Sequence, residues 1–467
     1  MIFPRMNRSR LLVVGLVLAV GRVMAAQEPA ADGPMTADPQ ITAALKQVSA
    51  ERIRANIEKL VSFGTRSTIS AQDEASLTAG RGVGAARDWI KAQFASYSKA
   101  CGGCLDVMTD TFTEKPQDRI PQPTVIANVY AVLRGADPES AKRMLLVTGH
   151  YDSRNSDTFN IKDNAPGAND DASGTAVSLE CARVLSGMSS QMKFPATIIF
   201  LAVAGEEQGL NGSHHFAQMA KDHKWDLEAV LNNDIVGGDK SAEQDHSVVR
   251  VFSEGLPAAA TEQEIQRIRA LGGENDSASR ELARYIYDVG RSYDAGVKPV
   301  LIFRLDRYLR GGDHYSFNQE GFAGVRFTEY REDFHHQHQN VRTENGTEYG
   351  DVLKFVDFEY VANVARLNAA TLASLALGPA PPANVHLLTK NLENDSTLTW
   401  DASPGGQANE YEVLWRDTTS SEWAYVQKVG AATRATMKLS KDNVIFAVRA
   451  VDSQGHTSLP VVPVPER

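Results

Sequence analysis

Two long apolar runs of β-prone residues, each ending in polar side chains, restrict the fold of this chain more than any other feature. Residues 144–149 lead directly into His150, and residues 196–204 lead through Gly205 into Glu206. Uninterrupted apolar runs of this kind are typical of buried parallel strands. In α/β proteins, sites lie at the carboxyl ends of such strands. We therefore expect an α/β fold with a functional site where these strands end.

Five short segments carry acidic and histidine residues in an order that suits two divalent metal ions. Carboxylates and imidazoles are ligands for zinc and for other divalent transition metals, and these segments offer no thiolate. Two ions about 3.5–4 Å apart need a bridging ligand, which a carboxylate provides. A general base must reach the reacting water without binding metal, so the adjacent Glu206 and Glu207 are expected to divide these roles. The segments are His150-Tyr151-Asp152, Asn169-Asp170-Asp171-Ala172-Ser173-Gly174, Gly205-Glu206-Glu207, Asn232-Asn233-Asp234 and His335-His336-Gln337-His338.

Taken in this order, the segments resemble peptidase family M28, a family of zinc peptidases that includes bacterial secreted aminopeptidases. They extend from His150 to His338, and framework similarity covers residues 41–376. One isolated motif would be weak evidence for this family, but all five motifs in the same order are specific to it. The resemblance implies a three-layer α/β/α sandwich with a mixed, mostly parallel sheet. It also implies an exopeptidase that hydrolyses a peptide or protein substrate.

The same resemblance implies a role for each metal ligand. Asp170 would bridge two Zn²⁺ ions. His150 and Asp234 would complete one site, whereas Glu207 and His338 would complete the other. Other divalent transition metals would also suit this mixture of carboxylate and imidazole.

Two residues would serve catalysis without binding metal. Glu206 would be the general base, and Asp152 would lie behind His150 and fix the tautomer of its ring. Family members have a cis peptide after the bridging aspartate, so we expect one between Asp170 and Asp171. Alone, each motif has a plainer explanation as a turn, a solvated helix start or a helix N-cap.

The histidine of the fifth segment, residues 335–338, is the metal ligand that the family motif constrains least. Family members often have His-Thr-Pro-x-Asp-Thr there, and the segment beginning at His338 aligns if Arg342 replaces the aspartate. This alignment selects His338 and leaves His336 as the alternative. The family often has Asp-His near the pocket at the position of Asp313 and His314, so His314 is expected to line the substrate cavity.

The N-terminus predicts export to the periplasm or the extracellular space. Residues 1–25 have a basic start, a short apolar core and small residues at a cleavage position, as in a signal peptide. The core is too short to span a bilayer, so we expect no stable membrane insertion after cleavage. Residues 26–40 are rich in Ala, Pro and Asp and predict a mobile lead-in. The M28-like domain is expected at residues 41–378.

The three cysteines suit an oxidising compartment. Cys101 and Cys104 flank two glycines between a helix-like and a strand-like stretch, and a disulfide there would fix the turn. A redox role lacks a thioredoxin-like context, and a metal site would need more ligands. Cys181 lies in an apolar helical stretch and is expected to be a small buried residue.

Residues 379–467 differ in character from the preceding chain. They begin with a stiff run of Pro and Ala, and short alternating stretches then predict a separate β-sandwich. This tail resembles a fibronectin type III domain, with Trp400 and residues 411–413 at the expected places. Such a module would bind cell wall or a partner, or act as a passive spacer.

Elsewhere, helix-like and strand-like stretches alternate, which supports an α/β sandwich. Long helices are predicted at residues 41–60 and 353–375, a shorter helix at 84–94 and a strand at 124–133. Residues 254–292 are interpreted as an insertion or a connecting helix.

These observations favour an exported dinuclear zinc aminopeptidase and leave three alternatives. A carboxypeptidase is one, because Arg326, Arg331 and Arg342 could bind a terminal carboxylate. A glutaminyl cyclase-like acyl transferase would bind a single zinc, and a non-catalytic binding ectodomain would lack ligands. The complete set of ligands argues against both. The net charge of −10 and the lack of a basic stripe give nucleic-acid binding no support.

Overall fold

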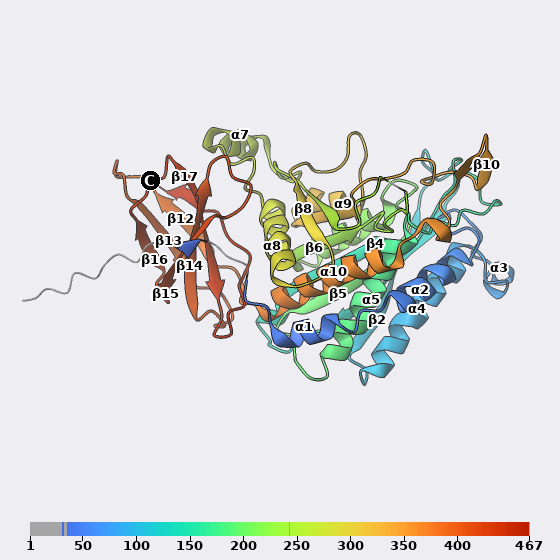
Figure 1. Cartoon of the computed structure of the whole chain (residues 1–467), viewed down its shortest axis with the longest axis horizontal. Coiled ribbons are helices and arrows are strands. Elements are labelled where there is room, and N and C mark those ends of the chain that lie inside the picture. Colours follow the sequence, from blue (N-terminus) through green and yellow to red (C-terminus); the bar gives the residue numbers. More distant parts are fainter. Residues whose placement is uncertain (1–29, 32–34, 242, 467) are drawn as a thin grey trace, which may run out of the picture.

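An eight-stranded mixed sheet forms the centre of the larger part of the molecule (Figure 1). The structure is a computed structural model and describes residues 30–31, 35–241 and 243–466. The predicted signal peptide, residues 1–25, lies outside them. In spatial order the strands are β2 (Leu105–Glu114), β3 (Thr124–Leu133), β5 (Thr197–Val203), β4 (Arg143–His150), β6 (Asp226–Asn233), β9 (Gly324–Glu329), β7 (Val248–Ser253) and β8 (Lys298–Ile302).

Strand β5 shows why its sequence is apolar without interruption. Side chains of a strand alternate between the two faces of a sheet. Ile198 and Phe200 therefore pack into the core on one face, and Ile199 and Leu201 pack into the core on the other. Strand β4 is parallel to both of its neighbours, β5 and β6, and β6 is parallel to β9. The pairs β2–β3, β3–β5 and β7–β9 are antiparallel, so the sheet is mixed.

Helices cover both faces of this sheet, which confirms the predicted three-layer α/β architecture. The larger core lies under α1 (Pro39–Leu45), α2 (Ala50–Val61), α4 (Gly82–Ala100), α5 (Ala172–Met188), α8 (Ala278–Ser292) and α10 (Phe358–Leu377). The opposite core lies under α6 (Asn211–Asp222) and α9 (Asp313–Gln319). The remaining elements are α3 (Glu74–Thr78), α7 (Glu262–Leu271), the 3-10 turns at Ser140–Lys142 and Leu353–Phe355, and the hairpin β10 (Arg342–Glu344) with β11 (Thr347–Tyr349).

Two predicted helices differ from the observed ones because capping residues interrupt them. The helix predicted at residues 41–60 is divided into α1 and α2 at Ser49. The hydroxyl of Ser49 accepts a hydrogen bond from the Arg52 amide at 3.3 Å. The helix predicted from residue 353 begins instead at Phe358, where Asp357 caps its first turn. Residues predicted to be an insertion form α7 and α8.

The lead-in predicted to be mobile is held by the fold wherever the structure describes it. Ala30–Ala31 form strand β1, which pairs with β15 (Tyr425–Gly430). The carboxylate of Asp38 accepts hydrogen bonds from the first amides of α1, and its own amide donates to the Tyr293 hydroxyl at 3.0 Å. The prediction overlooked that a proline and an aspartate at this point suit the first turn of a helix.

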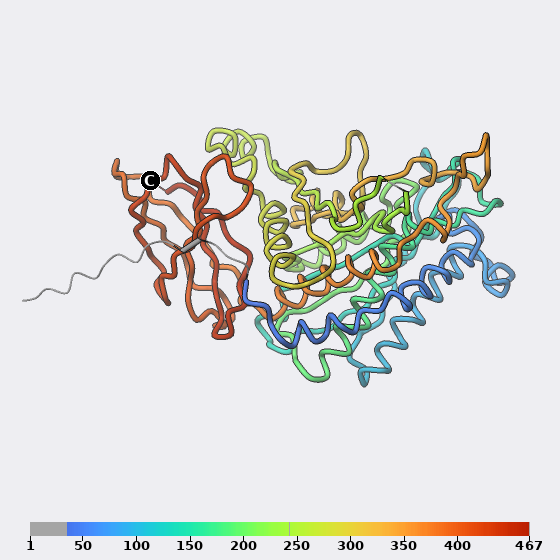
Figure 2. The backbone as a smooth tube through the Cα atoms, in the orientation of Figure 1, coloured from blue at the N-terminus to red at the C-terminus, as the bar shows by residue number. Residues whose placement is uncertain are grey.

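The C-terminal part consists of two four-stranded sheets gathered at one end of the molecule (Figure 2). One sheet contains β1, β15, β14 (Glu410–Asp417) and β17 (Val444–Val451). The other contains β16 (Arg434–Met437), β13 (Ser396–Asp401), β12 (Ala383–Leu388) and β18 (Val464–Glu466). The predicted all-β fold of the tail is confirmed, whereas its resemblance to a fibronectin type III domain remains a prediction.

The tail packs directly against the larger part and is more than a module on a tether. The indole N–H of Trp423 donates to Glu281 Oε2 in α8 at 3.0 Å. The Arg284 guanidinium donates to the backbone carbonyl of Ser421 at 2.7 Å. Arg416 forms a buried ion pair with Asp276, just before α8. No local pattern in the sequence predicts this interface, because each contact joins residues more than 130 positions apart.

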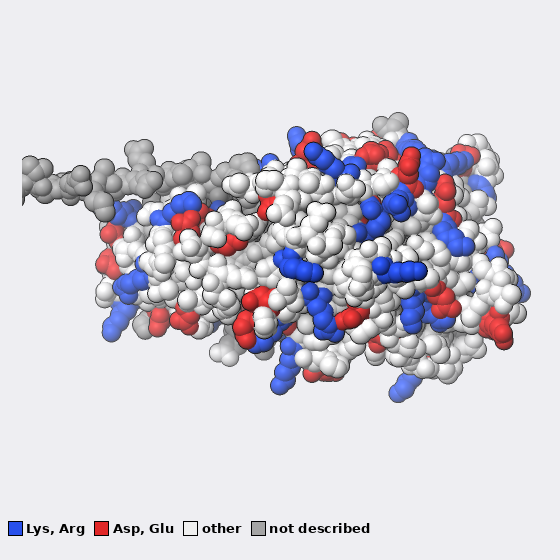
Figure 3. All heavy atoms as spheres, turned by 90° about the horizontal axis from the view of Figure 1, so that it is seen from below, with Lys and Arg blue, Asp and Glu red and all other residues white. Residues whose placement is uncertain are grey.

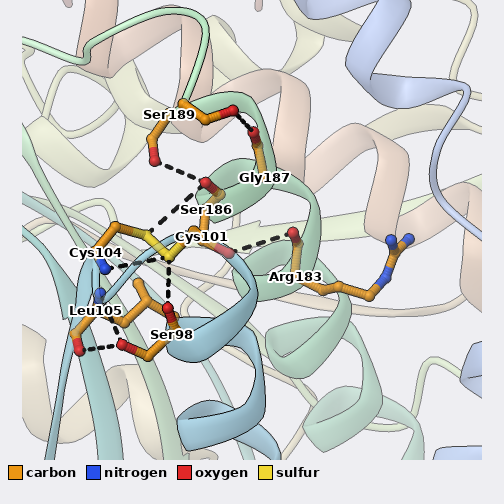
Figure 4. Close-up of a disulfide and its surroundings, with 9 residues drawn as sticks. Ser98, Cys101, Cys104, Leu105, Arg183, Ser186, Gly187 and Ser189 are labelled. Carbon is orange, nitrogen blue, oxygen red and sulfur yellow. Dashed lines mark hydrogen bonds between the residues drawn. A yellow bond between two sulfur atoms is a disulfide. The ribbon is translucent and has the colours of Figure 1, made fainter.

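Cys101 and Cys104 form the predicted disulfide at the junction between α4 and β2 (Figure 4). The hydroxyl of Ser98 donates to the Leu105 carbonyl and closes the same turn. Cys181 is free and fully buried, as predicted. On the face drawn in Figure 3, basic and acidic side chains are interspersed with uncharged surface. In the part of the chain that the structure describes, no helix has the length and apolar character needed to cross a membrane.

Candidate metal centre

The predicted ligands meet where the central parallel strands end. His150 is the last residue of β4, and Asp234 directly follows β6. Glu206 and Glu207 lie in the turn after β5. Because β5, β4 and β6 are parallel neighbours, their carboxyl ends lie along one edge of the sheet. The arrangement expected from the apolar runs is therefore present.

Asp170 lies between the two histidines, with one carboxylate oxygen toward each. Its Oδ1 is 3.2 Å from His150 Nε2, and its Oδ2 is 2.8 Å from His338 Nε2. The peptide bond between Asp170 and Asp171 is cis, as expected. Asp171 caps α5 and also accepts a hydrogen bond from the His150 amide at 3.0 Å. The N-cap and the ligand arrangement thus coexist in one segment.

Two groups of three side chains share Asp170 and fit divalent ions. The ligand atoms of each group lie within 4.8 Å of one another. Two buried atoms support this fit, because His150 Nε2 and Glu207 Oε1 make no hydrogen bond within the described ranges. Buried polar atoms are normally paired, so such atoms call for another partner. Nitrogen and oxygen donors of this kind suit zinc. The first group consists of His150, Asp170 and Asp234. The second consists of Asp170, Glu207 and His338.

The carboxylate of Asp152 organises the residues around it. His150 Nδ1 lies 3.4 Å from Asp152 Oδ1 and 3.2 Å from the Asp152 carbonyl. The same carboxylate accepts hydrogen bonds from the amides of Glu206 and Glu207 and from the Thr68 hydroxyl, at 3.3, 3.1 and 2.8 Å. Asp152 therefore lies beside the His150 ring, where the role predicted for it would require it, and it also fixes the turn that carries both glutamates, which the sequence did not reveal.

The structure brings His338, and not His336, to the shared carboxylate. His338 Nε2 is also 3.2 Å from Glu207 Oε2. His336 instead bonds through Nδ1 to Asp239 and stacks on Phe355, with ring centroids 3.5 Å apart. It belongs to a separate group with Asp239 and Asp333.

Two arginines contact the predicted ligands: sequence reasoning missed Arg154 and gave Arg326 a different role. Arg154 donates to Glu207 Oε2 at 2.9 Å and lies 2.7 Å from His338 Nδ1. Arg326 is fully buried, and its guanidinium is 2.9 Å from Asp234 Oδ1. It also pairs with Asp306 at 3.3 Å, so it is not available for a substrate carboxylate. An arginine between Val and Phe in β9 was the available signal, because a buried arginine requires paired acids.

The electrostatics of the site favour positive charge at its centre. Burial opposes protonation of His150, yet Asp152 and Asp170 hold its pKa well above the usual range. Burial also opposes protonation of His338, but Glu207 and Asp170 raise its pKa to about 10. Burial and the neighbouring acids raise the pKa of Glu206 well above that of a free glutamate. Metal binding would displace the protons of the imidazoles, because a histidine ligand must be neutral.

A cavity of about 320 Å³ opens onto these residues. His314 does not line it, contrary to the expectation, because its ring is buried and its Nε2 lies 2.9 Å from the Leu305 carbonyl. The polar lining consists of Asp170, Glu206, Glu207, Asp234, Gln337 and His338, together with Arg119, Arg154, Arg307 and Arg310. The four arginines therefore bring several guanidinium groups to the lining of one cavity.

Comparison with known proteins shows which family and which structures this chain is similar to. Residues 128–356 match the model of peptidase family M28. A probable zinc metalloprotease of Pyrenophora teres f. teres is 45% identical over 92% of this chain and 88% of its own. A probable zinc metalloprotease of Pyricularia oryzae is also 45% identical, over 96% of this chain and 87% of its own. Among solved structures, the Legionella pneumophila LapA aminopeptidase has a TM-score of 0.49 and 20% identity, covering 79% of this chain and 77% of its own. Fimbriiglobus ruber glutaminyl cyclase has a TM-score of 0.47 and 19% identity, and the match covers 70% of this chain and 95% of its own.

Proposed function

Because the chain belongs to peptidase family M28 and is a zinc metallopeptidase, we propose that it is an exported aminopeptidase that uses two zinc ions. The observation that carries the proposal is the position of Asp170. Its two carboxylate oxygens face two histidines, and each histidine lies beside a further carboxylate. A glutaminyl cyclase-like enzyme with one zinc would have no need for this second group.

Zinc ions held in these two groups would polarise the scissile carbonyl and make the attacking water more acidic. Glu206 is the residue that we assign to proton transfer. It lines the cavity, and it belongs to neither group of candidate ligands that share Asp170. Its backbone amide is anchored by Asp152, so the residue is held at the site without acting as a ligand.

The proton path then follows from the position of this carboxylate. Glu206 accepts a proton from the attacking water and delivers it to the nitrogen of the leaving group, as a general base and then a general acid. The other side chains keep the ligands in place. Asp152 orients His150, Arg154 orients Glu207 and His338, and Arg326 holds Asp234.

The three arginines considered from sequence as carboxylate binders do not support a carboxypeptidase. Arg326 is buried in ion pairs, Arg331 pairs with Glu243 and Arg342 lies 3.1 Å from Glu344. None of them lines the cavity. A carboxypeptidase remains the second candidate for a different reason, because Arg119 and Arg310 do line it.

A pair of blocked peptides tests the proposal. The metal-loaded full chain should hydrolyse a peptide with a free amine and an amidated carboxyl end, and a chelator should abolish this activity. The converse peptide, acetylated at its amine and free at its carboxyl end, should resist. Hydrolysis of only the converse peptide would establish the carboxypeptidase and refute the aminopeptidase.

A further inference from the structure

The wall of the cavity carries more positive than negative charge outside the metal ligands. Arg307 and Arg310, which line it, both pair with Glu332 Oε2 at 2.8 Å, and Glu332 is shared with Arg250, which lies outside the lining and pairs with its Oε1 at 2.9 Å. Burial opposes ionisation of Glu332, yet the arginines lower its pKa to about 2. One carboxylate cannot neutralise three guanidinium groups. Asp306 compensates part of the excess, but it is shared between Arg307 and Arg326.

Arg119 stands out because it has no acidic partner. Its one hydrogen bond runs from Nη1 to the backbone carbonyl of Glu207 at 3.1 Å. Among the residues that the structure describes, no carboxylate lies within ion-pair distance of it. Arg119 thus brings an uncompensated positive charge to the lining of the cavity, directly beside a proposed metal ligand.

The backbone that carries Arg119 is fixed, although its side chain is exposed. Gln117 and Ile120 form two backbone hydrogen bonds of 2.8 and 2.9 Å that close a tight turn. Ile120 is fully buried, and the Gln117 side chain donates to Asn211 Oδ1 at 2.7 Å. A solvated surface arginine needs no such anchoring. Preorganisation of this kind lowers the entropic cost of binding a ligand.

From the absence of an acidic partner and the anchored turn, we propose that Arg119, with Arg310 of the same cavity lining, binds a carboxylate of the peptide substrate. Guanidinium and carboxylate groups pair through two parallel hydrogen bonds. The carboxylate is the side chain of an acidic residue or the terminal carboxylate of a short peptide. This inference rests on the proposed peptidase activity and names the substrate class of the same cavity.

The test compares kcat/KM for matched pairs of dipeptide substrates. Leucyl-aspartyl amide is compared with leucyl-asparaginyl amide, and aspartyl-alanyl amide with asparaginyl-alanyl amide. Leucyl-alanine is compared with its own amide, which tests the terminal carboxylate. We expect the charged member of at least one pair to be favoured about 10- to 100-fold, as for a hydrogen bond between charged groups. The preference should appear mainly in KM and should weaken with added salt.

Variants assign the preference to Arg119. In the pair that shows the preference, Arg119→Gln should bring the ratio of kcat/KM between the charged and the neutral substrate close to one. Arg119→Lys should retain part of the preference. Asp118→Asn is the matched control, because Asp118 lies on the same turn and does not line the cavity. It should leave the ratio unchanged. Metal content and circular dichroism confirm that each variant is folded.

The outcomes separate this inference from the proposed function. Equal rates within every pair, or a preference that survives Arg119→Gln, would overturn the inference while leaving the peptidase intact. Failure of the metal-loaded chain to release the N-terminal residue from any of the dipeptides, charged or neutral, would refute the proposed function itself. A response confined to leucyl-alanine would identify the terminal carboxylate as the group that is bound.

Discussion

Replacement of Trp423 by phenylalanine should weaken the attachment of the tail to α8. Trp423 is 4% exposed, and its indole N–H donates to Glu281 Oε2 at 3.0 Å. Glu281 is itself buried and keeps only Arg284 as a charged partner within α8. Phenylalanine fills most of the same volume but leaves the Glu281 oxygen without its donor.

The expected loss is about 1.5–3 kcal/mol of unfolding free energy, the usual contribution of a hydrogen bond to a charged group. Trp423→Ala should cost more, about 3–5 kcal/mol, because it also leaves a cavity. Trp400→Phe is the matched control. Trp400 is equally buried, at 4% exposure, but its indole nitrogen makes no hydrogen bond within the described chain. The Trp400→Phe variant therefore measures the loss of unfolding free energy that comes from the smaller ring alone.

Urea denaturation of the full chain, followed by circular dichroism, measures these losses. Trp423→Phe should lower the unfolding free energy by at least about 1 kcal/mol more than Trp400→Phe, with an uncertainty of about 10–15% from the extrapolation. Equal losses in the two variants would refute the argument that this buried hydrogen bond holds the tail.

Other parts of the molecule support three more predictions. Glu206→Gln should lose most turnover and retain its metal, whereas Glu207→Gln should lose metal by elemental analysis; identical behaviour would refute the division of roles. Replacement of Cys101 and Cys104 by serine should cost about 2 kcal/mol in chemical denaturation, as for a loop of about four residues, and no loss would show that the turn is fixed without the disulfide. Burial opposes protonation of His456, but its hydrogen bonds to Asp452 and Asp38 raise its pKa. The stability that this histidine contributes should be complete below 6.5, the ordinary pKa of an unfolded histidine, and should disappear as pH rises through the raised pKa. The difference in stability between the wild type and His456→Gln should therefore shrink toward alkaline pH in urea denaturation, and a difference that grows would contradict this.

The sheet, and the meeting of the predicted ligands at its edge, could be predicted because they have local signatures. The runs before His150 and Glu206 are apolar on both faces of a strand, which requires a buried position in the sheet. Polar residues directly after such strands must lie at one edge. His338 was harder to place, because no strand precedes it and only its alignment with the family motif distinguished it from His336.

The features that sequence reasoning missed depend on contacts between distant segments. Arg119 and Glu207 are 88 positions apart, and Trp423 and Glu281 are 142 apart. Nothing near either residue indicates its partner. His314 was misplaced for a more local reason, because the carbonyl of Leu305, nine positions earlier, lies 2.9 Å from its Nε2 inside the protein. Side-chain direction within a loop depends on such contacts and not on a repeating pattern.

Zinc content per chain tests the central claim most directly. Native mass spectrometry and elemental analysis should find two zinc ions in the wild type, because Asp170 is shared between two groups of ligands. Asp234→Asn should lose one ion, and Asp170→Asn should lower occupancy at both sites. A single tightly bound ion in the wild type that is unaffected by Asp234→Asn would contradict the dinuclear centre.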